Sequence, residues 1–360
     1  MFLIEFVCAF VLVIVLCLFL GPLFISMGIV AHAGGRHIHN GSIPLVGGSA
    51  MILALAISEF LIVKTDSFDM HFYALLFLSA IPVFLVSLLD DRYEVHPLMR
   101  LTVQAFSVLI SMRVLGFEIS YIGTNELQMP LGIWATPFTV VTGLFFINAF
   151  NMSDGIDGQC GSVAIIAFLF LALNAPPTVA HIATLIIAAL LGFLCLNYPF
   201  SGQLSLRAKI NATKVFMGDS GSATLGMLYF CLFILACQES MWESLNFFGG
   251  RAITELNFYE CWYFAFLPLV DALHTVALRL IRRQNPLQGG LDHFHHALLY
   301  ARFAPKEALL RSIFISIIFF ILGSLVVTAD LGGLFNGSVF LVSLILFSAY
   351  KAHLFHKTTT

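Results

Sequence analysis

Apolar runs about as long as a bilayer is thick recur from one end of this chain of 360 residues to the other. Hydrophobic residues make up 59% of the sequence and charged residues only 10%, and the mean hydropathy is +0.96. Soluble globular proteins contain about a quarter charged residues, so this composition excludes an ordinary soluble domain. No long polar linker divides the chain. We therefore predict one all-α polytopic integral membrane domain over residues 1–360.

A helix needs about twenty apolar residues to cross the hydrocarbon core, and this length predicts about eleven transmembrane helices. They lie near residues 3–30, 44–64, 71–89, 98–115, 132–150, 160–174, 178–196, 220–238, 258–281, 309–329 and 333–350.

The first apolar run, residues 1–30, ends near an Ala-His-Ala tripeptide of the kind that follows a signal peptide. However, the run carries Glu5 and no Lys or Arg before its apolar part, and it is too long for a signal sequence. We expect an uncleaved first helix that is interrupted at Gly21 and Pro22.

Positive charges are divided unevenly between alternate loops. Only Lys64, Arg113 and Arg251 of the 17 lysines and arginines fall in one set of loops. Because short cytoplasmic loops are enriched in Lys and Arg, this division places the N-terminus outside and the C-terminus in the cytoplasm. The predicted cytoplasmic set is Arg36, Arg92, Arg100, Arg207, Lys209, Lys214, Arg279, Arg282, Arg283, Arg302, Lys306, Arg311, Lys351 and Lys357.

On the predicted outer side, the stretch "FEISYIGTNELQMPLG" (117–132) alternates apolar and polar residues around a Gly-Thr-Asn turn. This alternation predicts a small extracytoplasmic β-hairpin, with an ordered loop as the alternative.

Four segments on the predicted cytoplasmic side hold most of the reactive side chains. They are "LLDDRYEVHP" (88–97), "NAFNMSDGIDG" (148–158), "KVFMGDSGSATLG" (214–226) and "GGLDHFHHALLYARF" (289–303). Adjacent carboxylates at a membrane boundary are costly unless a cation compensates them. The glycines favour turns in which the backbone approaches a ligand closely. The helix that begins at Asp219 is also expected to offer free N–H groups to a phosphate.

Each segment has an ordinary explanation when it is taken alone. The Asp pair can be a solvated helix cap, the glycine-rich turns can simply connect spans, and the histidines can be solvated. Phe216 is by default an aromatic side chain that faces lipid or the core. The presence of all four segments on one predicted face favours chemistry instead.

The available side chains suit phosphoryl transfer. Carboxylate and amide oxygens are the ligands that Mg²⁺ prefers, and cations hold the oxyanions. Histidines without nearby thiolates do not demand zinc. The seven cysteines are scattered without a C-x-x-C pair, so neither a zinc site nor a disulfide framework is indicated.

The ordered set of motifs resembles the polyprenyl-phosphate N-acetylhexosamine-1-phosphate transferases, and especially the bacterial undecaprenyl-phosphate N-acetylglucosamine-1-phosphate transferases. The motifs are "RHIHNGSIPLVGG" (36–48), "DDR" (90–92), "NAFNMSDGIDG" (148–158), "VFMGDSGSATLG" (215–226), "PLVDALHTVALRLIRRQNP" (268–286) and "HFHH" (293–296). The resemblance covers most of the chain. It implies that a UDP-N-acetylhexosamine donates sugar-1-phosphate to undecaprenyl phosphate, which releases UMP and leaves a diphosphate-linked lipid for cell-surface glycan synthesis.

The resemblance also implies roles for individual residues. Asp219 would be the principal ligand of Mg²⁺, for which Mn²⁺ can substitute, and Asn151 would be a second ligand. Asp90 would act as a base or organise the acceptor phosphate, and Phe216 would stack on uracil. The full catalytic set is Asp90, Asp91, Asp219, His293, His295 and His296. The substrate-binding set is Arg100, Asn148, Asn151, Asp154, Asp157, Phe216 and Arg282.

One departure from the family pattern concerns the sugar. Relatives carry an Asp three residues before the first histidine of the last motif, whereas this chain has Gly290 there and Asp292 next to His293. The motif also lacks three consecutive histidines, which are typical of the peptidoglycan branch. As the sugar donor we therefore rank UDP-N-acetylglucosamine first, other UDP-N-acetylhexosamines, such as those of deoxyaminosugars, next and UDP-MurNAc-pentapeptide last.

The alternative class is a transporter, in which intramembrane acids and broken helices mark an ion or substrate pathway. The acids of this chain gather instead at one set of predicted span ends, and no paired repeat is evident. The enzyme hypothesis places the protein in the bacterial inner membrane, with its active site facing the cytoplasm and with membrane lipids, but no nucleic acid, as partners. Direct attack and a covalent intermediate both stay open, as do a monomer and a homodimer.

Overall fold

The computed structural model describes residues 2–31, 43–58, 67–124, 127–198, 214–237, 261–287, 290–329 and 333–356, and most of them are helical. The helices are α1 (Phe2–Ser26), α2 (Gly47–Ile57), α3 (Ser67–Tyr93), α4 (Pro97–Val114), α5 (Ala135–Met152), α6 (Gln159–Asn174), α7 (Pro177–Asn197), α9 (Asp219–Ala236), α11 (Cys261–Phe264), α12 (Phe266–Ile281), α13 (Phe294–Tyr300), α14 (Pro305–Ala329) and α15 (Gly333–His356). A short 3₁₀ helix, η2 (Gly132–Trp134), precedes α5.

Two small antiparallel hairpins complete the described residues. The hairpin of β3 (Tyr121–Thr124) and β4 (Leu127–Pro130) confirms the hairpin predicted between residues 117 and 132. The hairpin of β1 (Val30–Ala31) and β2 (Ile43–Pro44) was not predicted, and it pairs Val30 with Pro44. The intervening motif residues 36–42 lie outside the described residues, as do Lys64, Arg207, Lys209, Arg251 and Lys357.

Within the described residues, seven helical segments are long and apolar enough to cross a membrane. They belong to α1, α3, η2 with α5, α7, α9, α14 and α15, and the apolar helices α2 and α6 are shorter. A helix satisfies all of its interior backbone hydrogen bonds within itself, which is why runs of this composition become helices in a bilayer. Together these helices support a multi-pass membrane protein, as predicted.

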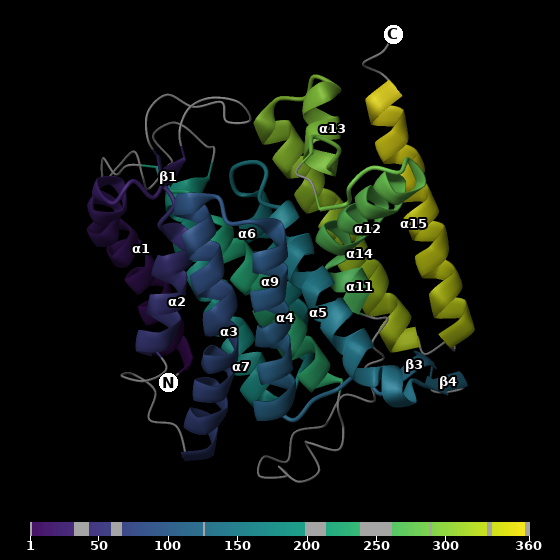
Figure 1. Cartoon of the computed structure of the whole chain (residues 1–360), viewed down its shortest axis with the longest axis horizontal. Coiled ribbons are helices and arrows are strands. Elements are labelled where there is room, and N and C mark those ends of the chain that lie inside the picture. Colours follow the sequence, from purple (N-terminus) through teal and green to yellow (C-terminus); the bar gives the residue numbers. More distant parts are fainter. Residues whose placement is uncertain are drawn as a thin grey trace.

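The elements at the two ends of the bundle differ. Figure 1 shows the N-terminus and the β3–β4 hairpin at one end, and the C-terminus and β1 at the other. The carboxyl ends of α3, α5 and α7 and the amino end of α9 share the β1 end, because their residues line one cavity. Three of the four segments selected from the sequence, 88–97, 148–158 and 214–226, therefore gather at a single end of the bundle.

Two predicted helix boundaries were wrong. The first helix is not interrupted at Gly21 and Pro22, since α1 continues through both to Ser26. Within a membrane, neighbouring groups can compensate for the hydrogen bond that a proline removes, so the helix can continue. Conversely, the predicted span 258–281 is broken at Ala265, between α11 and α12. Pro268 cannot donate a backbone N–H to the carbonyl of Phe264, which favours the break there.

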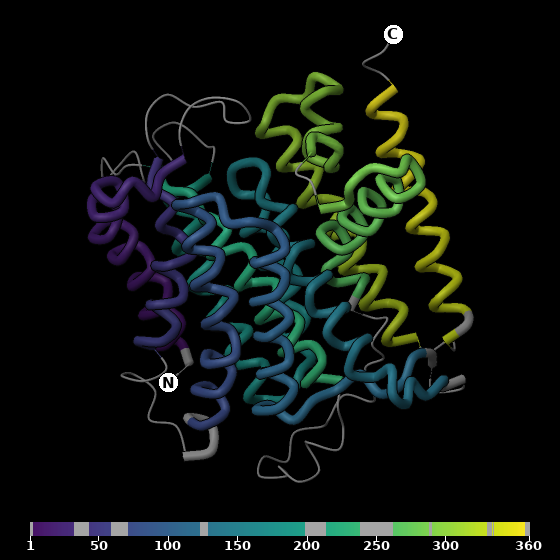
Figure 2. Tube along the Cα trace, in the orientation of Figure 1, coloured from purple at the N-terminus to yellow at the C-terminus, as the bar shows by residue number. Residues whose placement is uncertain are grey.

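Helix α9 forms the centre of the bundle. In its apolar span 89% of the residues are buried, compared with 22% in α1, α14 and α15. It packs against α3 and α5, and its side chain Tyr229 lies among the rings of Phe146, Phe150 and Phe168. Figure 2 shows α15 at the edge of the bundle, far from α1 along the long axis. The core helix thus carries Asp219 at its first position, where the cavity begins.

Glycines allow α2 and α9 to approach very closely. A Cβ on Gly48 would collide with the backbone of Gly221 and would lie 3.0 Å from the carbonyl oxygen of Met217. The N–H of Gly48 donates to that same carbonyl at 2.8 Å. This contact fixes the strand-like segment before α9 against the start of α2.

We expect Gly48→Ala to destabilise the protein, because the added methyl group meets backbone atoms that cannot rotate away. Overpacking of this kind costs about 1–3 kcal/mol, which corresponds to a lower unfolding temperature by roughly 2–10 °C. Thermal unfolding of purified protein in detergent would measure the change. Gly337→Ala is the matched control, since nothing lies within 4 Å of the added Cβ on α15. Equal unfolding temperatures for the two variants would contradict this account of the α2–α9 contact.

Candidate active site

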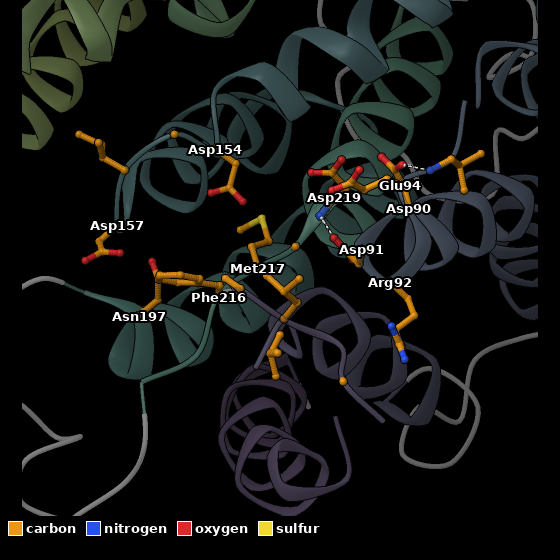
Figure 3. A pocket seen from close by; sticks show the side chains of 18 of the residues that line it. Asp90, Asp91, Arg92, Glu94, Asp154, Asp157, Asn197, Phe216, Met217 and Asp219 are labelled. Atoms are coloured by element: carbon orange, nitrogen blue, oxygen red, sulfur yellow. Dashed lines mark hydrogen bonds between the residues drawn. The ribbon is translucent and has the colours of Figure 1, made fainter. Parts of the chain in front are cut away.

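Five aspartates from three separate parts of the chain line one cavity of about 930 Å³, and Glu94 adds a sixth carboxylate. Figure 3 shows Asp90 and Asp91 at the end of α3, Asp154 and Asp157 in the turn after α5, and Asp219 at the start of α9. The sequence predicted that these segments meet on one side of the protein, and the structure brings them to the same cavity. Arg92, Glu94, Asn197, Phe216 and Met217 complete the labelled wall.

Asp91 caps the central helix. Its carboxylate accepts hydrogen bonds from the backbone N–H groups of Asp219, at 2.7 Å, and Ser220, at 3.1 Å. Gly218 has a φ of +76°, and a Cβ there would lie 2.7 Å from Asp91 Oδ2, so glycine is required at this position. The expectation that these N–H groups are free for a phosphate was therefore wrong, because a carboxylate from α3 occupies them.

Arg100 joins two of the acids. Its Nη1 donates to Asp90 Oδ2 and also lies 3.3 Å from Asp219 Oδ2. The other oxygen of Asp90 accepts from the N–H of Val95 at 2.7 Å. The side chain of Asp219 is 41% exposed, compared with 10% for Asp90. Asp219 is therefore the more accessible carboxylate, whereas Asp90 is held on both of its oxygens.

Asn151 lies beside Asp219, as the predicted metal pair requires. Its amide donates to Ser222 Oγ at 3.1 Å and also interacts with the Asp219 carboxylate. Asn148, by contrast, donates to Gln104 Oε1 at 2.8 Å between α5 and α4 and to the carbonyl of Leu144, and neither asparagine lines the cavity. The structure thus joins Asn151, but not Asn148, to the acidic cluster.

The acidic cluster fits a magnesium ion better than a metal that needs a complete protein cage. Among the residues that the structure describes, no group of three or more His, Cys, Asp or Glu side chains is arranged to hold an ion. Mg²⁺ is usually bound through one or two carboxylates, with water and substrate phosphates completing its coordination. Asp219 provides carboxylate oxygens of this kind in the cavity wall, and Asn151 contacts Asp219 without being part of that wall.

The far end of the cavity carries a different set of groups. Asp157 pairs with Lys214, whose Nζ lies 4.9 Å from the centre of the Phe216 ring. Asp154 points into the cavity (Figure 3). Loss of hydration within the protein, and then the negative charges of Asp219 and Asp157, raise the pKa of Asp154 to about 7. A cation that entered the cavity would favour the ionised form of this carboxyl group.

Asn197, at the end of α7, ties the two loops of this end together. Its Oδ1 accepts from the N–H of Gly158 at 2.7 Å, and its Nδ2 donates to the carbonyl of Val215 at 2.9 Å. The sequence did not predict a role for Asn197, and it indicated Lys214 only as one of the positive charges that predict the orientation of the protein in the membrane. The one available signal was an amide at the predicted end of an apolar span.

The three histidines lie behind the cavity wall. His295 is buried, and its ring lies so close to Gly155 that any side chain at that position would collide with it. Burial, with the nearby His296, lowers the pKa of His295 to about 3. Its ring stacks on that of His293 with a centroid separation of 5.9 Å. His293, His295 and His296 are not part of the described cavity wall, although His295 supports the turn that carries Asp154.

Arg282 lies at the exposed end of α12, away from the cavity wall. The buried arginine of this region is Arg279, which donates from Nε to Asp292 Oδ2 at 2.8 Å and pairs with the second oxygen through Nη2. Gly290 leaves the space that Arg279 and Asp292 occupy. The sequence predicted Arg282 beside the histidines, and it did not predict the pairing of Arg279 with Asp292.

Comparison with known proteins places these features in a wider group. Residues 73–237 match the family described as glycosyl transferase family 4. The chain is 30% identical over 294 residues to the undecaprenyl-phosphate alpha-N-acetylglucosaminyl 1-phosphate transferase of Yersinia pestis, which covers 79% of this chain and 73% of that protein. The protein of the same name from Escherichia coli K12 is 29% identical over 79% of this chain and 72% of its own length. The Haemophilus influenzae protein of that name is 27% identical over 82% of this chain and 78% of its own length.

We expect Asn197→Ala to destabilise the protein strongly, because the N–H of Gly158 and the carbonyl of Val215 both lose a buried partner. Each unsatisfied buried group costs about 1–3 kcal/mol. Thermal unfolding in detergent would measure the loss. Asn174→Ala is the control, since Asn174 also ends a helix but donates only to the carbonyl of Phe170 in its own helix. If both variants lost the same stability, Asn197 would not be the link between the two loops.

Proposed function

Because the chain belongs to glycosyl transferase family 4, we propose that it transfers N-acetylhexosamine-1-phosphate from a UDP-sugar to undecaprenyl phosphate. N-acetylglucosamine is the first candidate for the sugar, since the similar bacterial proteins carry that activity in their names. The product would be a diphosphate-linked lipid that starts a cell-surface glycan, and UMP would be released. One observation carries this proposal: five aspartates, a bridging arginine and an aromatic ring meet in a cavity at one end of the bundle.

The two ends of the cavity suit the two halves of the donor. Phe216 offers a ring face on which uracil can stack, and Asp154 and Asp157 offer acceptors for the N–H and hydroxyl groups of uridine. Lys214, which lies over the same ring, can contact a phosphate once a ligand competes with Asp157. Stacking and hydrogen bonds of this kind orient the donor so that its diphosphate lies toward Asp219.

We assign the metal to Asp219 and Asn151. When bound there, Mg²⁺, or Mn²⁺ in its place, would neutralise the charge that develops on the diphosphate oxygens. The chain contributes the positions of these ligands, because α9 is fixed in the core and Asn151 is held by Ser222. Asp91 acts indirectly, since its contact with the N–H groups of Asp219 and Ser220 holds the first turn of α9.

The reaction balances as an exchange of one P–O bond for another. An oxygen of the acceptor phosphate attacks the phosphorus that bears the sugar, and the bond from that phosphorus to UMP breaks with its electron pair on UMP. No proton transfer is required if the acceptor phosphate is fully ionised, so Asp90 need only orient the acceptor through Arg100. Arg100 would then move from the carboxylates toward the incoming phosphate, for which it is the nearest cation on α4.

The same proposal sets the position of the protein in the cell. We infer a multi-pass protein of the bacterial inner membrane with the cavity facing the cytoplasm, where UDP-sugars are found. The clustering of the basic residues with the cavity end supports this orientation through the positive-inside rule.

The direct test uses purified protein in detergent with undecaprenyl phosphate, Mg²⁺ and radiolabelled UDP-N-acetylglucosamine. We expect label in the lipid phase, release of UMP and loss of both on chelation. Asp219→Asn should lower turnover on the order of 10²–10³-fold, because a metal ligand contributes several kcal/mol to transition-state stabilisation. Glu307→Gln, an exposed change on α14, is the control.

The outcomes of this assay are distinct. Lipid product only with another UDP-N-acetylhexosamine would correct the sugar. Unchanged Mg²⁺-dependent turnover in folded Asp219→Asn would overturn the metal assignment, and transport of a solute without UMP release would favour the transporter.

We expect Phe216→Leu to raise the KM for the UDP-sugar on the order of tenfold with a smaller effect on kcat. Stacking of a base on an aromatic ring contributes about 1–3 kcal/mol, and leucine retains the volume of the side chain without the ring face. Initial rates at varied donor concentration would measure this, with the KM for undecaprenyl phosphate as the internal control. An equal rise in both KM values would show that the side chain supports the whole cavity rather than uracil.

A further inference from the structure

A buried lysine on α15 contacts α12 next to the histidine loop, by which we mean residues 290–296 before and at the start of α13. Lys351 lies on α15, which is mostly exposed along its length, yet the lysine itself is only 1% exposed. Its Nζ donates to Asp271 Oδ1 at 2.6 Å and to Thr275 Oγ1 at 2.8 Å, both on α12. A buried charge is costly unless it is paired and hydrogen-bonded, so a lysine in this place calls for a specific explanation.

Asp271 also contacts the histidine motif. Its Oδ1 also accepts from the N–H of Phe294 at 3.0 Å, at the start of α13. Its Oδ2 lies 3.1 Å from His293 Nδ1. An ionised carboxylate can only accept hydrogen bonds, so this contact requires a hydrogen on His293 Nδ1, and in the neutral ring it leaves Nε2 as the acceptor.

The ring of His293 is in turn connected to the cavity. It stacks nearly parallel to the ring of His295, at an interplanar angle of 9°. His295 packs directly on Gly155, which is part of the cavity wall. A change in the orientation of His293 would therefore reach the turn that carries Asp154 and Asp157.

We propose that Lys351 is a positioning residue: by fixing the Asp271 carboxylate, it sets the tautomer and orientation of His293 and so supports the turn of the donor site. The consequence for turnover rests on the proposed function, whereas the effect on His293 does not. Lys351 is over fifty residues beyond the histidine motif in sequence, and no motif in the sequence analysis included it.

A purely structural role for Lys351 is the competing explanation, in which the lysine only attaches α15 to α12. The structure provides a matched control, because a second polar link joins the same two helices: His274 Nδ1 lies 2.8 Å from Ser348 Oγ. Ser348→Ala weakens that attachment without touching Asp271. The Lys351→Met variant removes the cation but keeps most of the side-chain volume.

Nitrogen-15 NMR of histidine-labelled full-length protein in nanodiscs tests the proposal without relying on catalysis. The signals of His293 are assigned by their loss in His293→Gln. We expect wild-type protein and Ser348→Ala to show the same Nδ1–H tautomer of His293, and Lys351→Met to shift both ring nitrogens of that residue. Unchanged His293 signals in folded Lys351→Met would overturn the proposal.

Turnover and stability separate positioning from attachment. We expect Lys351→Met to lower kcat about 10–100-fold, as is typical when a supporting residue of a site is lost, and Lys351→Arg to restore part of the loss. The double variant Lys351→Met with Asp271→Asn removes both buried charges, so its unfolding temperature should recover while kcat stays low, because an asparagine amide can donate to His293 Nδ1.

Recovery of both quantities in the double variant would show that Lys351 is only an attachment and would overturn the proposal. Absence of lipid product from wild-type protein, together with the expected NMR shifts, would instead reject the proposed function and leave the control of His293 by Lys351 in place.

Discussion

The cost of an uncompensated carboxylate at the edge of a membrane is the constraint on which the rest of this structure depends. Asp91 is satisfied by the first N–H groups of α9, Asp90 by Arg100, and Asp157 by Lys214. In each case the compensating group comes from a different part of the chain. The pairing of charges therefore also brings the ends of α3, α4 and α9 and the turn after α5 to one place, and it leaves a cavity where they meet.

The two sides of this cavity have different mechanical support. Asp219 begins the most deeply buried helix, and close glycine contacts hold that helix against α2, so its position is set by the core. The histidine loop lies farther out and is held by polar contacts between α12, α13 and α15. Under the proposed function, Asp219 as a metal ligand would benefit from a rigid position, whereas the segment that carries the histidines could adjust when the donor enters. The rigid support of Asp219 and the polar support of the histidine segment agree with these two requirements.

Much of this arrangement was predictable from the sequence, for a physical reason. Length and composition alone locate membrane helices. Motifs at alternate helix ends must then lie on one side of the membrane. Counting the spans therefore predicted that Asp90, Asp154 and Asp219 lie together, as they do in the cavity. What the sequence does not contain is the identity of each partner. That Asp91 caps α9, or that Lys351 reaches α12, depends on how helices far apart in sequence pack, and apolar periodicity carries no information about which oxygen meets which donor.

The departure at residue 290 illustrates how charge compensation constrains the final loop. A carboxylate at position 290 would meet Arg279, and in this chain that arginine is paired by Asp292 instead, through both of its oxygens. The carboxylate has thus been displaced along the chain rather than lost, and Arg279 remains neutralised. The glycine at position 290 thus coincides with a buried arginine whose charge is compensated from position 292.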